Sequence, residues 1–430
     1  MPLGLHTRCL SRLSETLQSA LTTFRVDQGN FLNRASLEKL VSIENVIPKE
    51  RALCDKLQCY ISETPFFDFV YGQLSKELRE TQDYVSDSVG VPLTSIPAYS
   101  DASAVARRLV EAFEALPRTY RFTFKLNRSL SALLQAEAMQ LSRHWSLVRP
   151  NKEFCEEFAL QSGIPGRDKW LHGLGLMMLG GPMSKEWDSE SAYLQCESAG
   201  FIGAWTSTVP EHHAVASLKS ILGVGFAIRA FDEEPSYSSR LLRHRAYVHE
   251  KVGDKWIIYS SIELDEELSR LITHLKIDEL NGTLKTDKAK AAFLGNRMRL
   301  LSMALSPGSV NDRLLLAGRW LLDSYVTQNQ LLAFVQCAVA LEILLGDKAV
   351  SDVLGIGELL RNRCAYLIGK SHQQRLDILN DFNEIYKVRS KIVHRGKDRL
   401  TGQEMQLFYK LRWMVSRVVQ EEVELLEQNA

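Results

Sequence analysis

The stretch Asn383–Gly396 reads NEIYKVRSKIVHRG and indicates how the rest of the chain is organised. Its apolar side chains recur at the spacing of one helix face, at Ile385, Val388, Ile392 and Val393. A glycine then stands where a helix would be expected to stop. The stretch therefore predicts an amphipathic helix that buries one apolar stripe and ends at Gly396.

The polar side of this predicted helix is rich in basic side chains, namely Lys387, Arg389, Lys391, His394 and Arg395. Cations near a helix C-terminus interact favourably with the backbone dipole, so a solvated basic helix end explains them without any function. The alternative explanation is chemical. A histidine exchanges a proton near neutral pH, and an arginine holds phosphate oxygens in a bidentate fork. Together they would cleave RNA without a metal, by deprotonating a ribose 2′-hydroxyl and stabilising charge on the phosphorus.

The spacing of Arg389 and His394 constrains any such site. Five positions along an ideal helix turn through about 500°, which leaves the two side chains roughly 140° apart around the axis. They do not share one face of a straight helix. Either the helix ends or bends at His394, or the site combines two copies of the chain related by a two-fold axis, which would make dimerisation a condition of activity.

The segment Val388–His394 is similar to a known motif, in which an arginine and a polar residue are followed by three positions, the last two apolar, and a histidine. This order resembles the signature of HEPN domains, and specifically of the ApeA-like branch. Two upstream stretches resemble the family's long core helix, with its Ala-Leu-Glu signature, and the helix after it, in the expected order: Phe334–Gly346 and Leu360–Gly369. The resemblance covers roughly residues 296–430, under a third of the chain.

This resemblance to HEPN domains implies a metal-independent endoribonuclease without a cofactor, whose product ends in a 2′,3′-cyclic phosphate. It implies His394 as the general base or acid and Arg389 as the phosphate clamp. The supporting residues that it implies are Ser390, Glu342 and Arg363. The residues expected to contact RNA are Lys387, Lys391 and Arg395.

Glu342 also has a structural explanation. It lies in an otherwise apolar predicted helix, and a carboxylate is rarely buried without a partner. An ion pair with Arg363 or another cation would account for it. Between Arg361 and Arg399 the chain has ten basic residues against four acidic ones, an excess of six that suits a phosphate backbone and equally suits solubility.

The partners expected from the HEPN resemblance are RNA, with tRNA among the candidates, and a second copy of the chain bound through the helical bundle. The setting would be defence against phage or another intracellular stress. Residues 1–290 would then bind a regulatory protein or a phage-derived trigger. The alternative is a HEPN module that binds RNA or serves as a scaffold in a defence complex without cleaving anything.

Composition places the chain among ordinary globular proteins. It has 430 residues with 52 Lys and Arg against 52 Asp and Glu, so global charge does not indicate a nucleic-acid partner. Seven cysteines without a framework spacing indicate a reducing compartment, and we interpret Cys54 and Cys59 as buried thiols. The start of the chain lacks the pattern of a signal peptide, and its longest apolar stretch, Leu331–Leu345, is too short to span a bilayer. We therefore expect a cytoplasmic protein with no membrane partner.

The overall prediction is a mainly α protein. We expect a mostly helical N-terminal region over residues 1–155, an α+β region over 156–280, a linker over 281–295 and an antiparallel helical bundle over 296–430. Helical spacing is expected for Leu10–Leu21 and for Leu130–Leu141.

Two β elements are predicted within this helical chain. Arg118–Lys125 alternates as a strand does, and its aromatic and basic residues would stack bases only if they were exposed. Ala246–Glu250 and Lys255–Tyr259 form a predicted β-hairpin. Histidines at 212, 213, 244 and 249 lack carboxylates at a ligand spacing, so no metal site is expected.

Overall fold

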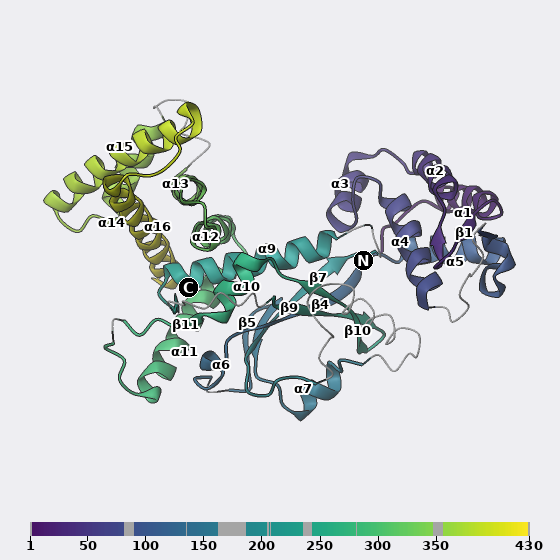
Figure 1. Ribbon diagram of the computed structural model, residues 1–430, viewed down its shortest axis with the longest axis horizontal. Helices are drawn as coiled ribbons and strands as arrows, with labels where there is room; N and C mark the ends of the chain where they lie inside the picture. Colours follow the sequence, from purple (N-terminus) through teal and green to yellow (C-terminus); the bar gives the residue numbers. More distant parts are fainter. Residues whose placement is uncertain are drawn as a thin grey trace.

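The computed structural model describes residues 2–80, 90–134, 136–161, 186–203, 206, 208–234, 243–280, 282–346 and 356–428. Figure 1 shows an N-terminal helical unit at one end, a sheet in the middle and the C-terminal helices at the other end. The described part is mainly helical, and the middle of the chain combines helices with strands. The predicted mainly α class, with an α+β middle region, is confirmed at this level.

The N-terminal unit has an apolar core of its own. Its helices are α1 (Thr7–Leu21), α2 (Arg34–Ile43), α3 (Arg51–Tyr60), α4 (Pro65–Glu80) and α5 (Ala102–Glu114), beside a small sheet of β1 (Arg25–Asp27), β2 (Phe31–Leu32) and β3 (Val91–Pro92). Leu13, Leu17 and Leu21 are fully buried, as the leucine spacing of α1 predicts. Cys54 and Cys59, expected to be buried, are exposed on α3 because that helix turns a single leucine, Leu57, fully inward.

Six antiparallel strands form the central sheet, in the order β10-β9-β4-β7-β6-β5. Their bounds are Lys255–Glu263, Arg245–Val252, Arg118–Lys125, Tyr193–Gly200, Trp145–Val148 and Ala138–Ser142. Strand β4 confirms the predicted strand, and β9 with β10 confirms the hairpin, which turns at Gly253 with a φ of 61°. The β4 aromatics Tyr120, Phe122 and Phe124 are fully buried, so they do not form a base-stacking surface.

The helical expectation for Leu130–Leu141 is wrong in its second half. Helix α6 is short (Arg128–Ser131), and β5 begins at Ala138. Strand β5 forms a local hairpin with β6, and β6 pairs with β7, which is distant in sequence, so sheet pairing overrides the helical spacing here. The sheet thereby takes strands from both sides of residue 155, where a domain boundary was expected. Helix α7 (Lys152–Glu157) lies within this region.

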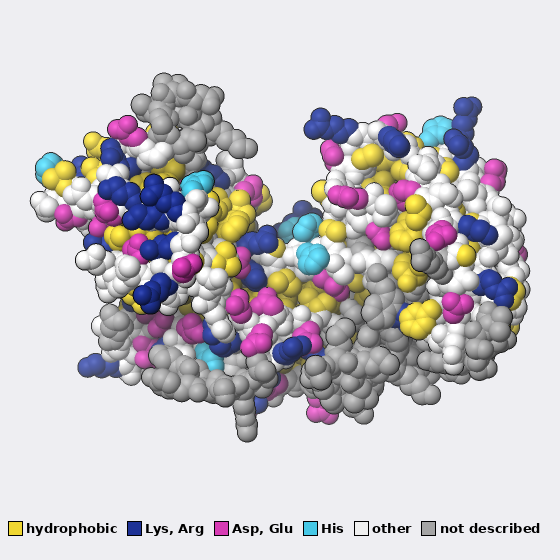
Figure 2. Space-filling model, turned by 45° about the horizontal axis from the view of Figure 1, so that its top comes forward, with side chains coloured by type: hydrophobic (Ala, Val, Ile, Leu, Met, Phe, Trp, Pro, Cys, Tyr) yellow, Lys and Arg dark blue, Asp and Glu magenta, His cyan; other side chains and the backbone are white. Residues whose placement is uncertain are grey.

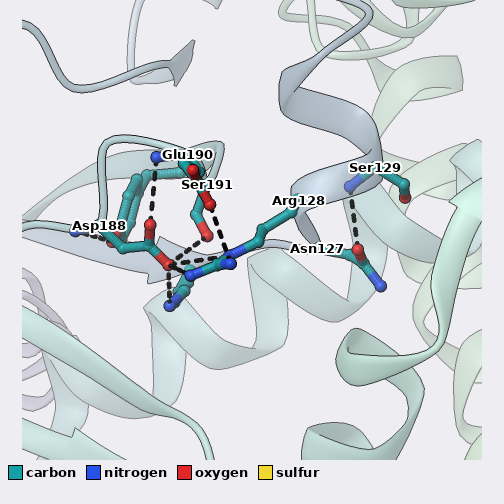
Figure 3. Close-up of polar contacts among 8 residues, drawn as sticks. Asn127, Arg128, Ser129, Asp188, Glu190 and Ser191 are labelled. Atoms are coloured by element: carbon teal, nitrogen blue, oxygen red, sulfur yellow. Dashed lines mark hydrogen bonds and ion pairs between the residues drawn. The ribbon is translucent and has the colours of Figure 1, made fainter.

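A charged cluster joins the end of β4 to the segment that leads into β7 (Figure 3). Arg128 extends from α6 and donates to the carboxylate of Asp188 at 3.0 Å, and Lys125 donates to the same oxygen at 2.7 Å. Burial opposes ionisation of Asp188, but these hydrogen bonds outweigh it and hold its pKa below the usual value. Asn127 caps α6 by accepting from the Ser129 N–H at 3.0 Å. The cluster therefore fixes the connection between two neighbouring strands.

The C-terminal helices match the helices predicted from the sequence, with bounds α11 (Asp287–Ala304), α12 (Ser309–Val326), α13 (Gln330–Leu345), α14 (Ile356–Ile368), α15 (His372–Arg395) and α16 (Gly402–Gln428). The expected linker 281–295 is helical from Asp287, because Thr286 caps α11 by accepting from the Ala289 N–H. No described helix is both long enough and apolar enough to cross a membrane.

Helix α9 (Val209–Ala227) joins the sheet to the C-terminal helices. Its last ten residues are almost all buried, including Leu218, Ile221 and Leu222. A helix that is apolar all round is a buried helix, and one apolar core runs from the sheet through α9 to α16. This core also takes in α10 (Glu266–Thr273) and the strand pair β8 (Phe231–Glu233) and β11 (Leu275–Ile277).

Backbones touch where α9 crosses α12. A Cβ atom added to Gly223 would lie 1.8 Å from the carbonyl oxygen of Gly318, and one added to Gly318 would lie 2.8 Å from the carbonyl oxygen of Ser220. Beside this crossing, Lys219 and Asp323 form an ion pair at 3.0 Å. The two glycines are therefore a packing requirement of the fold.

The N-terminal unit meets the sheet through a buried polar seam, which we define as Lys76, Arg118, Tyr120, Glu250 and Tyr259. Lys76 and Arg118 lie 3.7 and 3.5 Å from the Glu250 carboxylate, and the Lys76 ammonium stands 3.8 Å from the centre of the Tyr259 ring. Tyr120 and Tyr259 bond to the backbone of Ile202. Charges this buried are retained because they pair with one another.

We expect Gly223→Ala to destabilise the protein by about 1–3 kcal/mol, because the added methyl group meets a carbonyl oxygen that cannot move without shifting α12. Urea unfolding at neutral pH measures this change. Gly295→Ala on α11 is the matched control, since nothing lies within 4 Å of its added Cβ, and alanine there should stabilise by about 0.5–1 kcal/mol. Equal effects of the two substitutions would contradict the close crossing.

Candidate functional site

Helix α15 carries most of the residues singled out in the sequence. Ser371 caps its start by accepting from the Gln374 N–H, and Gly396 ends it in the left-handed region with a φ of 61°. The predicted helix and its stop are confirmed. Ile385 and Val388 are buried as expected, whereas Val393 is 49 % exposed because the last turn of α15 extends beyond its apolar contacts.

Arg389 lies against Glu342 of α13. Its Nε is 3.0 Å from Oε1, at an angle that does not form a hydrogen bond, and its Nη2 donates to Oε2 at 3.3 Å. Both side chains are 28 % exposed. The cation expected beside Glu342 is therefore Arg389, and the pair is partly accessible from solvent.

Tyr386 is the third member of this cluster, which we call the Glu342 cluster (Glu342, Tyr386 and Arg389). Its hydroxyl donates to Glu342 Oε1 at 3.0 Å. Burial, and next the charge of Glu342, raise the pKa of the Tyr386 hydroxyl above its usual range, so the hydroxyl keeps its proton. Sequence reasoning missed Tyr386, although its position three residues before Arg389 on one helix was an available signal.

Arg363 lies apart from the Glu342 cluster. It donates through Nη1 to the carbonyl oxygen of Leu345 at 2.9 Å, at the C-terminal end of α13. A cation there satisfies a carbonyl that has no partner within its own helix. Of the two supporting residues Glu342 and Arg363, only Glu342 lies beside Arg389. Arg363 instead bonds to the C-terminal end of α13.

A groove of about 770 Å³ follows the outer side of α15, and we call it the α15 groove. The polar and basic side chains along it include Asn380, Asn383, Lys387, Ser390, Lys391 and Arg395. Lys387 pairs with Glu384 at 2.6 Å, while Lys391 and Arg395 have no ion-pair partner among the described residues. Figure 2 shows Lys and Arg side chains gathered on this C-terminal part of the molecule, with a histidine at the edge of the group.

His394 is exposed in the last turn of α15. On an ideal helix it lies within about 20° of Lys387 and therefore on the side of the α15 groove. Arg389 instead faces α13. Because α15 continues to Arg395, the helix does not end before His394, and the two side chains do not converge within one copy of the chain.

The histidines of the middle region do not form a metal site in the described structure. His249 is fully buried on β9, its Nε2 lies 3.2 Å from the Ala159 carbonyl oxygen, and burial lowers its pKa to about 4. His212 and His213 are exposed on α9. Among the described residues, no three His, Cys, Asp or Glu side chains lie close enough together to hold a metal ion.

No protein-family model, no curated protein and no solved structure matches this chain. The assignment of a role to the site therefore depends on the side chains described above.

We expect Glu342→Ala to destabilise the protein by about 1–3 kcal/mol, because it leaves the Tyr386 hydroxyl and the Arg389 guanidinium half-buried without their shared acceptor. Thermal and urea unfolding measure the loss. Glu358→Ala is the control: this carboxylate is 60 % exposed and pairs with Arg361 at 3.4 Å, so its removal should cost at most about 0.5 kcal/mol. A small loss at both positions would mean that the Glu342 cluster does not stabilise the helices.

Proposed function

We propose that this protein is a metal-independent endoribonuclease of the HEPN type, in its ApeA-like branch, acting in defence against phage. The observation that carries the proposal is the arrangement of α15. Its exposed side lines a groove with Lys387, Lys391 and Arg395. His394 is not among the residues that line the groove, but it is exposed in the last turn, within about 20° of Lys387 around an ideal helix axis. Cations four residues apart on a helix follow one another at about 6 Å, a regular series along which an RNA backbone would lie.

The proposed chemistry needs no group that the chain lacks. His394 takes the proton of a ribose 2′-hydroxyl, the 2′-oxygen attacks the adjacent phosphorus, and the bond from phosphorus to the 5′-oxygen of the next nucleotide breaks. That oxygen takes a proton from water, and His394 returns its own proton to the solvent. The products are a 2′,3′-cyclic phosphate and a 5′-hydroxyl. Arg389 stabilises the charge on the phosphate oxygens, and the Glu342 cluster holds its guanidinium in one orientation beforehand.

Two copies of the chain would complete the site. Within one copy, Arg389 and His394 lie on different sides of α15, as their spacing of about 140° requires. A two-fold axis beside the last turns of two α15 helices would bring Arg389 of one protomer to His394 of its partner. The homodimer is therefore part of the proposal.

One observation favours a second candidate function. The Arg389 guanidinium already has a carboxylate partner, as a purely structural arginine would. A HEPN module that binds RNA or serves as a scaffold in a defence complex, without cleaving, fits this pairing. In both cases the N-terminal unit, with its separate core, is the part that we propose to contact a regulatory protein or a phage-derived trigger.

We expect the purified protein to cleave tRNA or total RNA in EDTA, and both Arg389→Ala and His394→Ala to reduce the rate by at least about 100-fold, the usual contribution of a positioned acid–base group. Cleaved ends should carry a 2′,3′-cyclic phosphate. His372→Ala is the matched control, because His372 is exposed at the opposite end of the same helix. Cleavage by the two site variants at the wild-type rate would remove the nuclease proposal and leave the scaffold.

Co-expression of Arg389→Ala with His394→Ala tests the shared site. If each site takes its arginine and its histidine from different protomers, half of the assembled dimers are mixed and each has one intact site. The mixture should then recover about a quarter of the wild-type rate. A mixture as inactive as its two components would show that one chain supplies both residues.

A further inference from the structure

A second hollow lies beside the α15 groove, between α15 and α16. It encloses about 400 Å³, within the size range of small-ligand sites, and we call it the Trp413 pocket. Its polar and aromatic lining comprises Gln374, Asp377, Asn380, Asp381, Lys410 and Trp413. Asn380 and Asp381 also line the α15 groove, so the two hollows are neighbours on α15.

The apolar part of this pocket consists of the indole of Trp413 and the side chain of Ile378. Trp413 is 42 % exposed, so part of its ring is accessible to a ligand. Asn380 and Gln374 bring amide groups, which both donate and accept hydrogen bonds. An aromatic face beside amides is the combination that binds an unstacked nucleobase, by stacking and by hydrogen bonds to its edge.

The charge of the Trp413 pocket differs from that of the α15 groove. Lys410 is neutralised by Asp381 at 2.7 Å, and the other carboxylate, Asp377, accepts only from the Gln373 amide, at 3.0 Å, among the described residues. The pocket therefore has a net negative charge, which disfavours phosphate. A carboxylate accepts hydrogen bonds, so a base that offers N–H donors is favoured. Guanine offers two such donors on its Watson–Crick edge.

We propose that the Trp413 pocket binds an unpaired guanine of the RNA whose backbone follows the α15 groove. The base stacks on Trp413, and Asp377 accepts hydrogen bonds from the N–H groups of the base. The Asn380 amide forms a hydrogen bond to the rest of the same base edge. This inference rests on the proposed function in taking RNA as the ligand. It adds a substrate class, namely single-stranded RNA with an unpaired guanine at a set distance from the cut.

The length of α15 sets that distance. Asn380 and His394 are fourteen residues apart, about 21 Å along an ideal helix. Lys387, Lys391 and Arg395 line the groove between and beyond them. The backbone would be held along this interval, so the bound guanine lies several nucleotides from the scissile phosphate. Paired RNA cannot present its base to the pocket, which confines recognition to loops and free ends.

The test measures binding of a fluorescent 12-nucleotide single strand that contains one guanine and has 2′-O-methyl groups throughout, so that it cannot be cleaved. Trp413→Ala should raise its Kd about 5- to 150-fold, the loss expected for one stacked base. Asp377→Asn should abolish the preference for this strand over one with uracil in place of guanine. Tyr409→Ala is the matched control: Tyr409 is 54 % exposed one turn away on α16 and does not line the pocket, so the Kd should not change.

Unchanged affinity of Trp413→Ala, absence of any guanine preference in the wild type, or a wild type that does not bind the strand would each overturn the proposal. A Trp413→Ala variant whose assembly changes in mass in sedimentation, while its RNA affinity does not change, would also overturn the proposal. That result would assign Trp413 to a contact between protein chains. Failure of the nuclease proposal is distinguishable. A wild type that binds the guanine strand but cleaves no RNA would support the guanine pocket and contradict the nuclease proposal. A Trp413→Ala variant that cleaves RNA normally and has an unchanged Kd would support the nuclease proposal and contradict the guanine pocket.

Discussion

The crossing of α9 and α12 at Gly223 and Gly318 is the constraint on which the C-terminal half of the protein depends. Two helices without side chains at their contact approach until their backbones touch, and this brings α12 onto a helix that is itself buried against the sheet. Helix α13 packs on α12, and α15 and α16 pack on α13. The α9–α12 crossing, although far from the candidate site, therefore determines the position of Glu342 and with it the orientation of Arg389.

Helix α15 has its acidic residues in its first part and middle and most of its basic residues in its second half. Its middle and first part contain Asp377, Asp381 and Glu384, and its last turns contain Lys391, His394 and Arg395. This order is also the one that the helix dipole favours, with cations near the C-terminus. The same side chains thus stabilise the helix and divide the neighbouring surface into a part suited to phosphate and a part that excludes it. For this reason charge alone did not distinguish a functional helix from a solvated one.

Local patterns predicted the helices and the strongest strands well. The stop of α15 at Gly396, the strand β4 and the turn at Gly253 each follow from short-range chemistry, and each is present. The missed strands β5 and β6 form a local hairpin that joins the sheet through the pairing of β6 with β7, some fifty residues away, and no local spacing reveals that partner. The helical start of α11 inside the expected linker depends on a cap at Thr286, a signal that was present and was given too little weight.

The residues of the candidate site also comprise some that local sequence patterns predicted and some that depend on packing between helices. The sequence predicted one basic side of α15 with Lys387, Arg389, Lys391, His394 and Arg395, and of these the structure turns Arg389 toward Glu342 of α13. The partner of Glu342 was open between Arg363 and another cation, and only the packing of α13 against α15 identifies it as Arg389. Tyr386 and Trp413 were not predicted, because an aromatic at helical spacing is more often part of a core. Their importance comes from the carboxylate and the hollow beside them.

The two apolar cores give the chain two units of cooperativity. Phe201 is the one residue of the sheet region that the N-terminal core contains among the described residues. The boundary also includes the buried polar seam around Glu250 and the contacts of α3 with β7 and α9, where the Phe201 N–H donates to the Tyr60 carbonyl oxygen at 2.9 Å. A molecule that binds only the folded form of the N-terminal unit stabilises that unit by mass action. Its effect can reach the C-terminal helices through the seam and also through α3, which contacts α9 directly.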